Sequence, residues 1–321
     1  MNYEKSQVGV LLINTGTPSE LNTKSIRNFL KEFLLDKRII QVSRIIWIPI
    51  LYLFILPFRP QKKVEDYKKI WMAEGSPLLV YTKRLLKKLN KSKFRKTNIN
   101  IDFAMRYGEP NIKKQLKKFS EKKINNLIIL PLFPQYSFST TESIKDKINS
   151  SLRELNWYPH INFIKEYYKD NLYINALAKS IKKDWKQEKG KLIFTYHGLP
   201  KKYIAKGDTY YQSCIDTTAL IAKRLKLKKE KYITSFHSKF GYGEWTKPYT
   251  EEILLELPKK GIRSVGIVSP SFSVDCLETL EEIAIQFKKE FIKAGGKEFK
   301  YIPCLNDKID QVLLIEKLMT I

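Results

Sequence analysis

Residues 263–283 read Arg263-Ser-Val-Gly-Ile-Val-Ser-Pro-Ser-Phe-Ser-Val-Asp-Cys-Leu-Glu-Thr-Leu-Glu-Glu-Ile283. Residues 263–269 form an apolar, β-branched run of strand length. Beyond a polar turn, apolar residues recur at helical spacing from Leu277 onward. We therefore expect a helix that starts near Asp275, with that aspartate as its N-cap. A strand, a turn and a helix in this order predict one βα unit of a parallel sheet.

Three acidic residues of this stretch lie at helical spacing. Asp275, Glu278 and Glu282 occupy positions i, i+3 and i+7, which would align three carboxylates along one stripe of the helix. One interpretation is a capped, solvated first turn, because helix N-termini favour acidic side chains. The other is an acidic functional site. The stretch alone does not decide between them, so the choice depends on residues elsewhere in the chain.

The same alternation of strands and helices runs through the rest of the chain. Apolar runs predict strands at 8–13, 99–105, 126–132, 161–164, 192–196, 232–236, 263–269 and 299–302. Amphipathic patterns predict helices at 23–35, 78–89, 172–186 and 308–319. Four strands followed by four more predict two similar doubly wound α/β domains, Rossmann-like or flavodoxin-like, each with a four-stranded parallel sheet. We expect one domain to span 1–165 plus 306–321, with the last helix folded back, and the other to span 166–305.

Composition limits the compartment and the partners. The 321 residues carry 59 Lys and Arg against 33 Asp and Glu, a net charge of +26. The lysines are scattered over every predicted helix instead of forming one basic segment, so we do not expect nucleic-acid binding. Three distant cysteines, Cys214, Cys276 and Cys304, make neither a disulfide framework nor a metal-binding pair. The apolar run at 8–13 is too short for a signal-peptide core, and we expect a cytoplasmic protein.

The segment 45–58 is apolar and carries no charge. It is shorter than the about 20 residues that a membrane-spanning helix needs, and Pro49 and Pro57 interrupt it. Two interpretations stay open: a buried part of the core, or an exposed apolar lip that receives an apolar ligand or touches a membrane.

Polar side chains cluster just past the predicted strand ends. In open α/β sheets the ligand crevice lies outside the carboxyl ends of the strands, so these residues should converge there. They are Asn14-Thr15, Arg106-Tyr107, Gln135-Tyr136-Ser137, His197 and His237-Ser238-Lys239.

His197 is the most informative of these residues. It ends a buried strand, where Gly198 permits close approach of the backbone and Pro200 stiffens the exit. By itself, this histidine could simply cap the strand. Facing the acidic stripe, it would form a His–carboxylate pair suited to Fe(II) or Zn(II), or to proton transfer. A structural zinc site is disfavoured, because it would normally require four N or S ligands. The sequence has no GxGxxG or GxxxxGK[ST] phosphate-binding loop, so nothing in it supports nucleotide binding.

Six motifs in register resemble the ferrochelatase family over nearly the whole chain. They are Leu11-Leu-Ile-Asn-Thr-Gly-Thr-Pro18, Trp71-Met-Ala-Glu-Gly-Ser-Pro-Leu78, Pro131-Leu-Phe-Pro-Gln-Tyr-Ser-Phe-Ser-Thr-Thr141, Thr195-Tyr-His-Gly-Leu-Pro200, Ser235-Phe-His-Ser-Lys-Phe-Gly241 and Pro270-Ser-Phe-Ser-Val-Asp-Cys-Leu-Glu-Thr-Leu-Glu-Glu282. The resemblance implies a chelatase fold and a lyase of haem biosynthesis that inserts Fe(II) into protoporphyrin IX to form protohaem.

The resemblance also implies where the substrates lie. Protoporphyrin would occupy a cleft between the two halves, with His197 and Glu278 paired at the metal and Glu282 continuing an acidic path behind them. To the porphyrin cleft we assign Asn14, Arg106, Tyr136 and Trp47, with Arg106 a candidate for the propionates. The pocket should bend the flat macrocycle toward its metallated geometry.

Two departures from the family pattern matter. The family often has Gln-Ser-Arg where this chain has His237-Ser238-Lys239, so an additional histidine changes the charge of the cleft. Some members carry an iron–sulfur cluster on a cysteine-rich C-terminal extension. The present sequence runs to Ile321 without such a cysteine-rich segment. We therefore expect no permanently bound cofactor and no cluster. We also expect a monomer, with segment 45–58 as a candidate for peripheral contact with a membrane.

The alternatives to a ferrochelatase are a non-catalytic haem or porphyrin carrier of the same fold, and a chelatase for another metal or tetrapyrrole. A carrier would be expected to lack the histidine or the acidic stripe, and both are present. The apolar lip favours protoporphyrin over a tetrapyrrole with many carboxylates.

Overall fold

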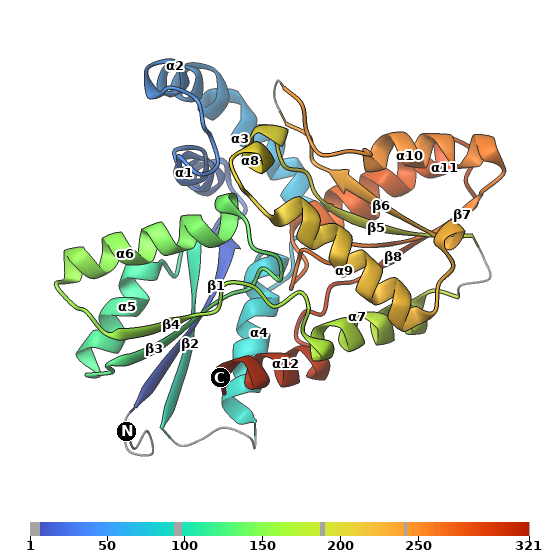
Figure 1. The fold of residues 1–321 in the computed structure, drawn as a ribbon. Coiled ribbons are helices and arrows are strands. Elements are labelled where there is room, and N and C mark those ends of the chain that lie inside the picture. The colour runs from blue at the N-terminus through green and yellow to red at the C-terminus, as the bar shows by residue number, and fades with distance from the viewer. Residues whose placement is uncertain (1–6, 93–97, 187–189, 241–242, 321) are drawn as a thin grey trace. The chain divides into compact units, whose positions relative to one another are not determined.

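The computed structural model describes residues 7–92, 98–186, 190–240 and 243–320. The chain divides into two compact units. Unit 1 comprises residues 1–133, 138–165 and 315–321, and unit 2 comprises residues 134–137 and 166–314. Figure 1 shows the elements of both.

Unit 1 is built on a four-stranded parallel sheet with the order β2-β1-β3-β4. Its strands are β1 (Val8–Gly16), β2 (Ile99–Tyr107), β3 (Asn126–Pro131) and β4 (His160–Phe163). Its helices are α1 (Thr23–Leu34), α2 (Arg44–Ile50), η2 (Leu51–Ile55), α3 (Leu56–Lys68), α4 (Pro77–Lys91), α5 (Ile112–Glu121), η3 (Phe138–Glu142) and α6 (Ser143–Leu155).

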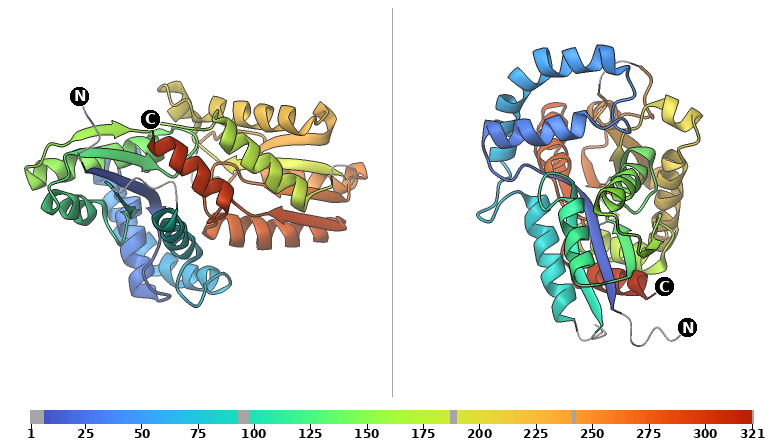
Figure 2. Two further views of the ribbon diagram at one scale, coloured as in Figure 1. Left: turned by 90° about the horizontal axis from the view of Figure 1, so that it is seen from below. Right: turned by 90° about the vertical axis from the view of Figure 1, so that its left-hand side faces the viewer.

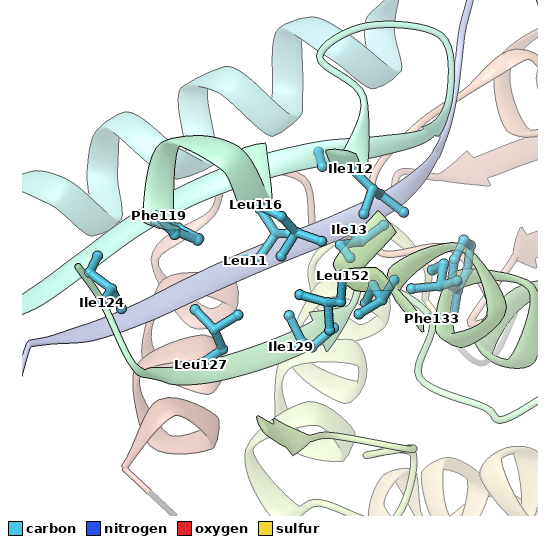
Figure 3. Close-up of a cluster of buried hydrophobic side chains, with 13 residues drawn as sticks. Leu11, Ile13, Ile112, Leu116, Phe119, Ile124, Leu127, Ile129, Phe133 and Leu152 are labelled. Carbon is cyan, nitrogen blue, oxygen red and sulfur yellow. The ribbon is translucent and has the colours of Figure 1, made fainter. Parts of the chain in front are cut away.

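The core on one face of this sheet follows from strand periodicity. Leu11 and Ile13 of β1 point to the same face because they are two residues apart, and both are fully buried. Leu116 and Phe119 of α5 pack against that face, together with buried residues of β3 and α6 (Figure 3). This packing anchors the strands, and so fixes where their carboxyl ends lie.

The uncharged segment 45–58 forms three consecutive helical pieces, α2, the π-helical η2 and the start of α3. Part of the segment is buried in the core and part is an exposed apolar surface, so each of the two interpretations left open by the sequence applies to some of its residues. Trp47, Leu51 and Leu56 are buried and pack with Leu34. The outward side chains are exposed: Ile45, Ile46, Ile48, Ile50, Tyr52, Leu53, Phe54 and Phe58. Within the described ranges, no helix is long and apolar enough to cross a membrane.

Unit 2 repeats the architecture with a second parallel sheet of order β6-β5-β7-β8. Its strands are β5 (Lys191–His197), β6 (Tyr232–His237), β7 (Ser264–Val268) and β8 (Glu298–Ile302). Its helices are α7 (Asn171–Asp184), α8 (Lys201–Ala205), α9 (Tyr210–Leu225), η4 (Lys229–Lys231), α10 (Thr250–Glu256), η5 (Pro258–Lys260), η6 (Glu278–Phe287) and α11 (Lys288–Lys293). The last helix, α12 (Ile309–Met319), continues into the part of the chain assigned to unit 1.

Helices cover both faces of the second sheet, as Figures 1 and 2 show for α7 and α9 on one side and α10 and α11 on the other. On the latter side, Ile193, Val265 and Ile267 of the strands pack against Ile283 and Phe287 of η6. Helix η6 is thus fixed to the strands that it follows.

The predicted fold class is confirmed, because two four-stranded parallel sheets alternate with helices. The helix predicted after β7 is present, but its N-cap is Leu277, so the prediction that Asp275 is the N-cap is wrong. Residues Glu278–Phe287 form a π-helix, which continues as α11. Its i→i+5 hydrogen bonds widen the helix, and such segments occur frequently at functional sites.

Candidate active site

Two histidines lie side by side at the carboxyl ends of adjacent strands in unit 2. His197 ends β5 and His237 ends β6, and the two residues are partners in the register of the parallel pair. Partners in a parallel sheet point to the same face. Their ring centroids are 5.8 Å apart, and the rings meet edge to face.

The half-buried His197 has one ring nitrogen in a hydrogen bond to the backbone, and its other ring nitrogen can bind a ligand. Its Nδ1 lies 2.9 Å from the carbonyl oxygen of Gly198. Since a carbonyl oxygen only accepts, Nδ1 carries the proton in this bond, and Nε2 keeps its lone pair for a metal ion or a proton.

Gly198 keeps this strand end close to its neighbour. Its amide donates to the carbonyl oxygen of His237 at 2.7 Å. A Cβ atom at position 198 would lie 2.9 Å from that oxygen and 3.2 Å from the ring of Trp245, so a side chain would push the strands apart. The close backbone approach predicted for Gly198 is confirmed.

His237 is fully enclosed, with only 3% of its surface exposed. Its Nδ1 lies 2.8 Å from the hydroxyl of Thr195, and its ring also packs on Phe272. Burial, followed by the nearby His197, holds the pKa of His237 well below its usual value, so the ring is neutral. Its Nε2 atom is buried and has no hydrogen-bond partner among the described residues.

Glu278 and Glu282, four residues apart, lie on the π-helix η6 and are half-buried. The amide of Ser238 donates to Glu282 at 3.0 Å and its hydroxyl at 2.5 Å. Burial raises the pKa of Glu282; the Ser238 hydrogen bonds and His197 oppose the rise, and Glu278 adds to it. Glu282 therefore lies within electrostatic reach of both residues predicted to hold the metal.

Asp275 does not belong to the acidic stripe that the sequence suggested. The residue is buried, and its carboxylate accepts hydrogen bonds from Tyr301 at 2.5 Å and Asn306 at 2.6 Å. It also accepts from the hydroxyl of Thr279 at 3.1 Å. Its strongest partners are therefore side chains, and not the first-turn backbone amides that an N-cap would bind. Asp275 thus ties the start of the helix to the segment after β8, and the prediction of a three-carboxylate stripe is wrong.

The chemistry available in unit 2 is that of a bare imidazole nitrogen beside two carboxylates. Such donors suit a divalent ion of intermediate softness or the acceptance of protons. In the part of the chain that the structure describes, no group of three or more His, Cys, Asp or Glu side chains is arranged to hold a metal ion. The third histidine, His160, is exposed at the start of β4, the opposite strand end from the site residues.

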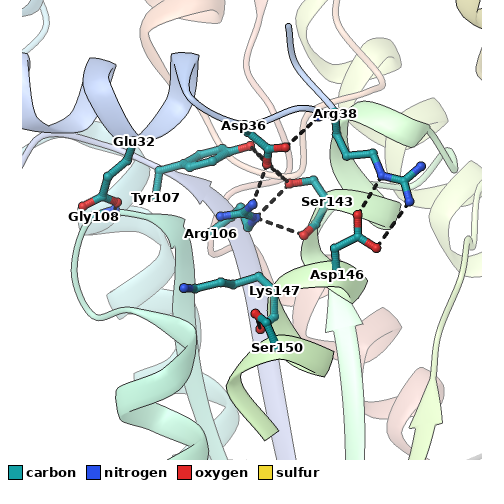
Figure 4. A network of polar contacts seen from close by, with 10 residues as sticks. All are labelled: Glu32, Asp36, Arg38, Arg106, Tyr107, Gly108, Ser143, Asp146, Lys147 and Ser150. Atoms are coloured by element: carbon teal, nitrogen blue, oxygen red, sulfur yellow. Dashed lines mark hydrogen bonds and ion pairs between the residues drawn. The ribbon is translucent and has the colours of Figure 1, made fainter. Parts of the chain in front are cut away.

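In unit 1, Arg106 is engaged within its own unit (Figure 4). Its Nη2 lies 2.5 Å from the carboxylate of Asp36, and its Nε donates to the hydroxyl of Ser143 at 2.8 Å. Its guanidinium also stacks over the ring of Tyr107. This network accounts for Arg106 without a ligand, and a role at the porphyrin propionates stays a prediction.

The other residues assigned to the porphyrin cleft are buried. Asn14 lies at the end of β1, and its side chain accepts from the amide of Thr15 at 2.8 Å. The indole of Trp47 donates to the carbonyl oxygen of Leu34 at 2.7 Å. Trp47 is therefore a core residue of its segment and not an exposed lip residue. Tyr136 is buried within the part of unit 2 formed by residues 134–137.

Several site residues were not identified from the sequence. Thr250 and Asp36 act through hydrogen bonds to residues distant in the chain, and no local pattern marks them. Thr195 begins the motif Thr195–Pro200, but the motif does not indicate its hydrogen bonds to His237 and Thr250. The position of Ser238 just past a predicted strand end did indicate a site residue. In the structure its φ is 60°, which is uncommon for a residue other than glycine. Gly241, the last residue of the motif that contains Ser238, lies outside the described residues.

Comparison with known proteins gives a consistent result over the full length. The profile of the ferrochelatase family matches residues 7–320. A ferrochelatase of Vibrio cholerae is 41% identical over 323 residues, which cover 100% of this chain and 99% of that protein. A ferrochelatase of Wigglesworthia glossinidia brevipalpis is 45% identical over 305 residues, 94% of each chain.

Solved structures support the fold. SirB of Bacillus subtilis, determined with Fe3+, superimposes with a TM-score of 0.57 at 12% identity and covers 98% of this chain and 95% of its own. The sirohydrochlorin chelatase SirB of Bacillus subtilis subspecies spizizenii, in complex with cobalt, gives 0.54 at 9% identity, with 96% and 91% covered. At these identities the likeness concerns the chelatase fold alone.

Proposed function

The chain belongs to the ferrochelatase family, lyases that insert Fe(II) into protoporphyrin IX to form protohaem, and we propose that His197 and Glu278 carry this reaction here. The observation that supports the proposal most directly is the tautomer of His197. Its Nδ1–H donates to the carbonyl oxygen of Gly198, which leaves the lone pair of Nε2 available at the edge of the sheet. Nearby, Glu278 and Glu282 supply the negative charge that a divalent ion requires.

The proposed roles follow from the proton balance of the reaction. Metallation removes the protons of the two pyrrole N–H groups and joins the iron to all four ring nitrogens, so two protons leave for each Fe(II) that enters. The Nε2 atom of His197 can accept one proton or hold the incoming ion. The carboxylate of Glu278 can help to replace the water of the ion and accept the other proton.

Glu282 is proposed to relay protons or metal behind this pair. Its position is set by the two hydrogen bonds from Ser238. Its raised pKa makes it easier to protonate than an ordinary glutamate, which suits a group that takes up a proton and passes it on.

We propose that the porphyrin contacts Asn14 and the exposed apolar face of segment 45–58. That face consists of the outward side chains Ile45, Ile46, Ile48, Ile50, Tyr52, Leu53, Phe54 and Phe58. The same face would suit a peripheral contact with a membrane, since contiguous exposed apolar side chains mark ligand or membrane sites. Trp47 would support this face from below, by packing with Leu51.

We propose that the protein works in the cytoplasm as a monomer, without an iron–sulfur cluster. Cys214, Cys276 and Cys304 are free and buried, and a cluster ordinarily takes four thiolates. A sample purified under anaerobic conditions should contain no stoichiometric acid-labile sulfide. Stoichiometric sulfide would contradict the proposal.

The decisive experiment is anaerobic incubation of the purified protein with Fe(II) and protoporphyrin IX. The free-base porphyrin bands should convert to those of protohaem with multiple turnovers. A porphyrin carrier would bind the porphyrin and leave its free-base spectrum unchanged. A chelatase for another tetrapyrrole would leave protoporphyrin unconverted and metallate a ring with more carboxylates.

A further inference from the structure

We propose that His237 supplies a second nitrogen ligand beside His197, through its Nε2 atom, and that this pair shifts the metal preference of the site toward Co(II), Ni(II) and Zn(II). The inference rests on the proposed role of His197 at the metal. It concerns a residue that the reaction as described above does not use.

A chain of hydroxyl groups fixes the protonation of His237. Thr250 donates its one hydroxyl proton to Ser235 at 2.9 Å. In its 2.6 Å contact with Thr195, Thr250 must therefore accept, and Thr195 donates. Thr195 has then used its own proton, so in the 2.8 Å contact with His237 it accepts from Nδ1–H. The tautomer that this chain of hydroxyl groups selects carries its proton on Nδ1 and its lone pair on Nε2.

The bare Nε2 lone pair has no partner in the described chain. Buried polar atoms are nearly always hydrogen-bonded, so an orphaned acceptor calls for an explanation such as an ion that is bound during function. Thr195 lies two residues before His197 on β5, back along the strand. Since Nδ1 binds the Thr195 hydroxyl, the lone pair of Nε2 is directed away from that hydroxyl.

The spacing of the two rings fits a shared ion. Two imidazoles joined to one ion by bonds of about 2.0–2.1 Å have their ring centres about 5 to 6 Å apart. The centroids of His197 and His237 are 5.8 Å apart, and both rings carry the proton on Nδ1. Two nitrogens hold an ion less firmly than the closed four-ligand sites of structural zinc, which is appropriate for an ion that must be passed on.

The chemical consequence is a change in selectivity. Imidazole nitrogen favours Co(II), Ni(II) and Zn(II) over Fe(II), because affinity rises along the series from Fe(II) toward the later metals. A second imidazole should strengthen that preference. The site would therefore bind and insert later metals more readily than a site in which an amide side chain replaces His237.

The test is binding of Zn(II) alone to the full-length protein without porphyrin, measured by competition with a chromophoric chelator. His237→Asn is the selective variant, because its amide can replace Nδ1 at Thr195 while Nε2 is lost. His237→Gln is a second variant with an amide near the position of Nε2. His160→Gln is the matched control, since it removes an exposed histidine at the far strand end. Melting temperatures verify that each variant is folded.

We expect His237→Asn and His237→Gln to raise the Kd for Zn(II) about tenfold or more, as loss of groups at a metal site typically does. Both variants should also lower the ratio of Zn(II) to Fe(II) insertion, and His160→Gln should change neither. Unchanged Zn(II) affinity in both His237 variants, with binding lost in His197→Ala, would overturn this inference and leave the proposed function intact. Unchanged affinity in His197→Ala as well would contradict the proposed metal site itself.

Discussion

Both hydrogen-bond donors of Ser238 bind the carboxylate of Glu282, the amide at 3.0 Å and the hydroxyl at 2.5 Å. The two residues are 44 positions apart, and the contact joins the end of β6 to the π-helix η6. The same strand end places His237 against His197. One short strand terminus thus positions a histidine and a carboxylate of the proposed site, and a shift of β6 would disturb both.

We expect Glu282→Gln to make the protein more stable at neutral pH. Because the folded state raises the pKa of Glu282, it binds a proton more tightly than the unfolded chain does. Stability should therefore fall as the pH rises from the ordinary glutamate value of about 4.3 through the raised folded value. Glutamine removes this loss and can still bond to Ser238. The difference in urea midpoint between variant and wild type should vanish below about pH 4. A variant less stable than wild type at pH 7.5 would contradict the assignment.

The fold could be read from the sequence because the signal is local. The central strands β1 and β5 are buried apolar runs between turns, so residues 8–13 and 192–196 are marked by their own composition. The π-helix could not be predicted, because apolar spacing from Leu277 fits an α-helix equally well. In the structure, Ile283 and Phe287 of this helix pack against the sheet.

The Asp36–Arg106 contact should stabilise unit 1 above the ordinary aspartate pKa. Burial opposes ionisation of Asp36, but the hydroxyl of Ser143, the charge of Arg106 and further hydrogen bonds lower its pKa overall. A lowered folded pKa contributes stability that is present above about pH 3.9 and is lost as the pH falls through the folded value. Asp36→Asn should cost about 3 kcal/mol at pH 7, because it leaves Arg106 partly buried without a counter-charge. Urea unfolding between pH 3 and 7 would measure both effects.

Asp146→Asn provides the matched control for that prediction. Asp146 pairs with Arg38 at 2.7 Å in the same region, but its side chain is 52% exposed (Figure 4). An exposed ion pair contributes about 0–1 kcal/mol. Equal losses in Asp36→Asn and Asp146→Asn would refute the special role of the buried pair.

The site was only partly predictable for a similar physical reason. His197 and the acidic residues of the following helix stood out as candidates because strand ends converge, and the family resemblance selected Glu278 among those acids. Arg106 also lies at a strand end, yet its partner Asp36 comes from a distant segment, and nothing in the local sequence indicates that its charge is compensated. Asp275 shares the helical spacing of Glu278, but Tyr301 and Asn306 bind it, and both come from the segment at β8 and beyond.

The apolar segment separates into residues for function and residues for stability. Leu53 and Phe54 are 63% and 65% exposed, so changing both to Ser should raise the KM for protoporphyrin or weaken vesicle binding with little effect on the melting temperature. Leu51 is fully buried, and Leu51→Ala should cost about 2–5 kcal/mol. If the Leu53/Phe54 double variant keeps the wild-type KM and vesicle binding, the exposed face has neither proposed role.

The last prediction concerns His197 and Glu278 acting as one unit. His197→Ala should lower turnover about 100-fold or more, the usual scale for loss of a general acid or base, while porphyrin binding, which depends on apolar contact, is largely retained. Glu278→Gln preserves size and removes charge, and we expect a similar loss. Because both residues serve the same ion and the same protons, the double variant should be hardly worse than the poorer single variant. Glu282→Gln should do less harm than either, since it acts behind the pair. Initial rates of Fe(II) insertion, with porphyrin binding followed by fluorescence, would measure all four variants. Near wild-type rates in both single variants would mean that the helix carries only a solvated acidic turn.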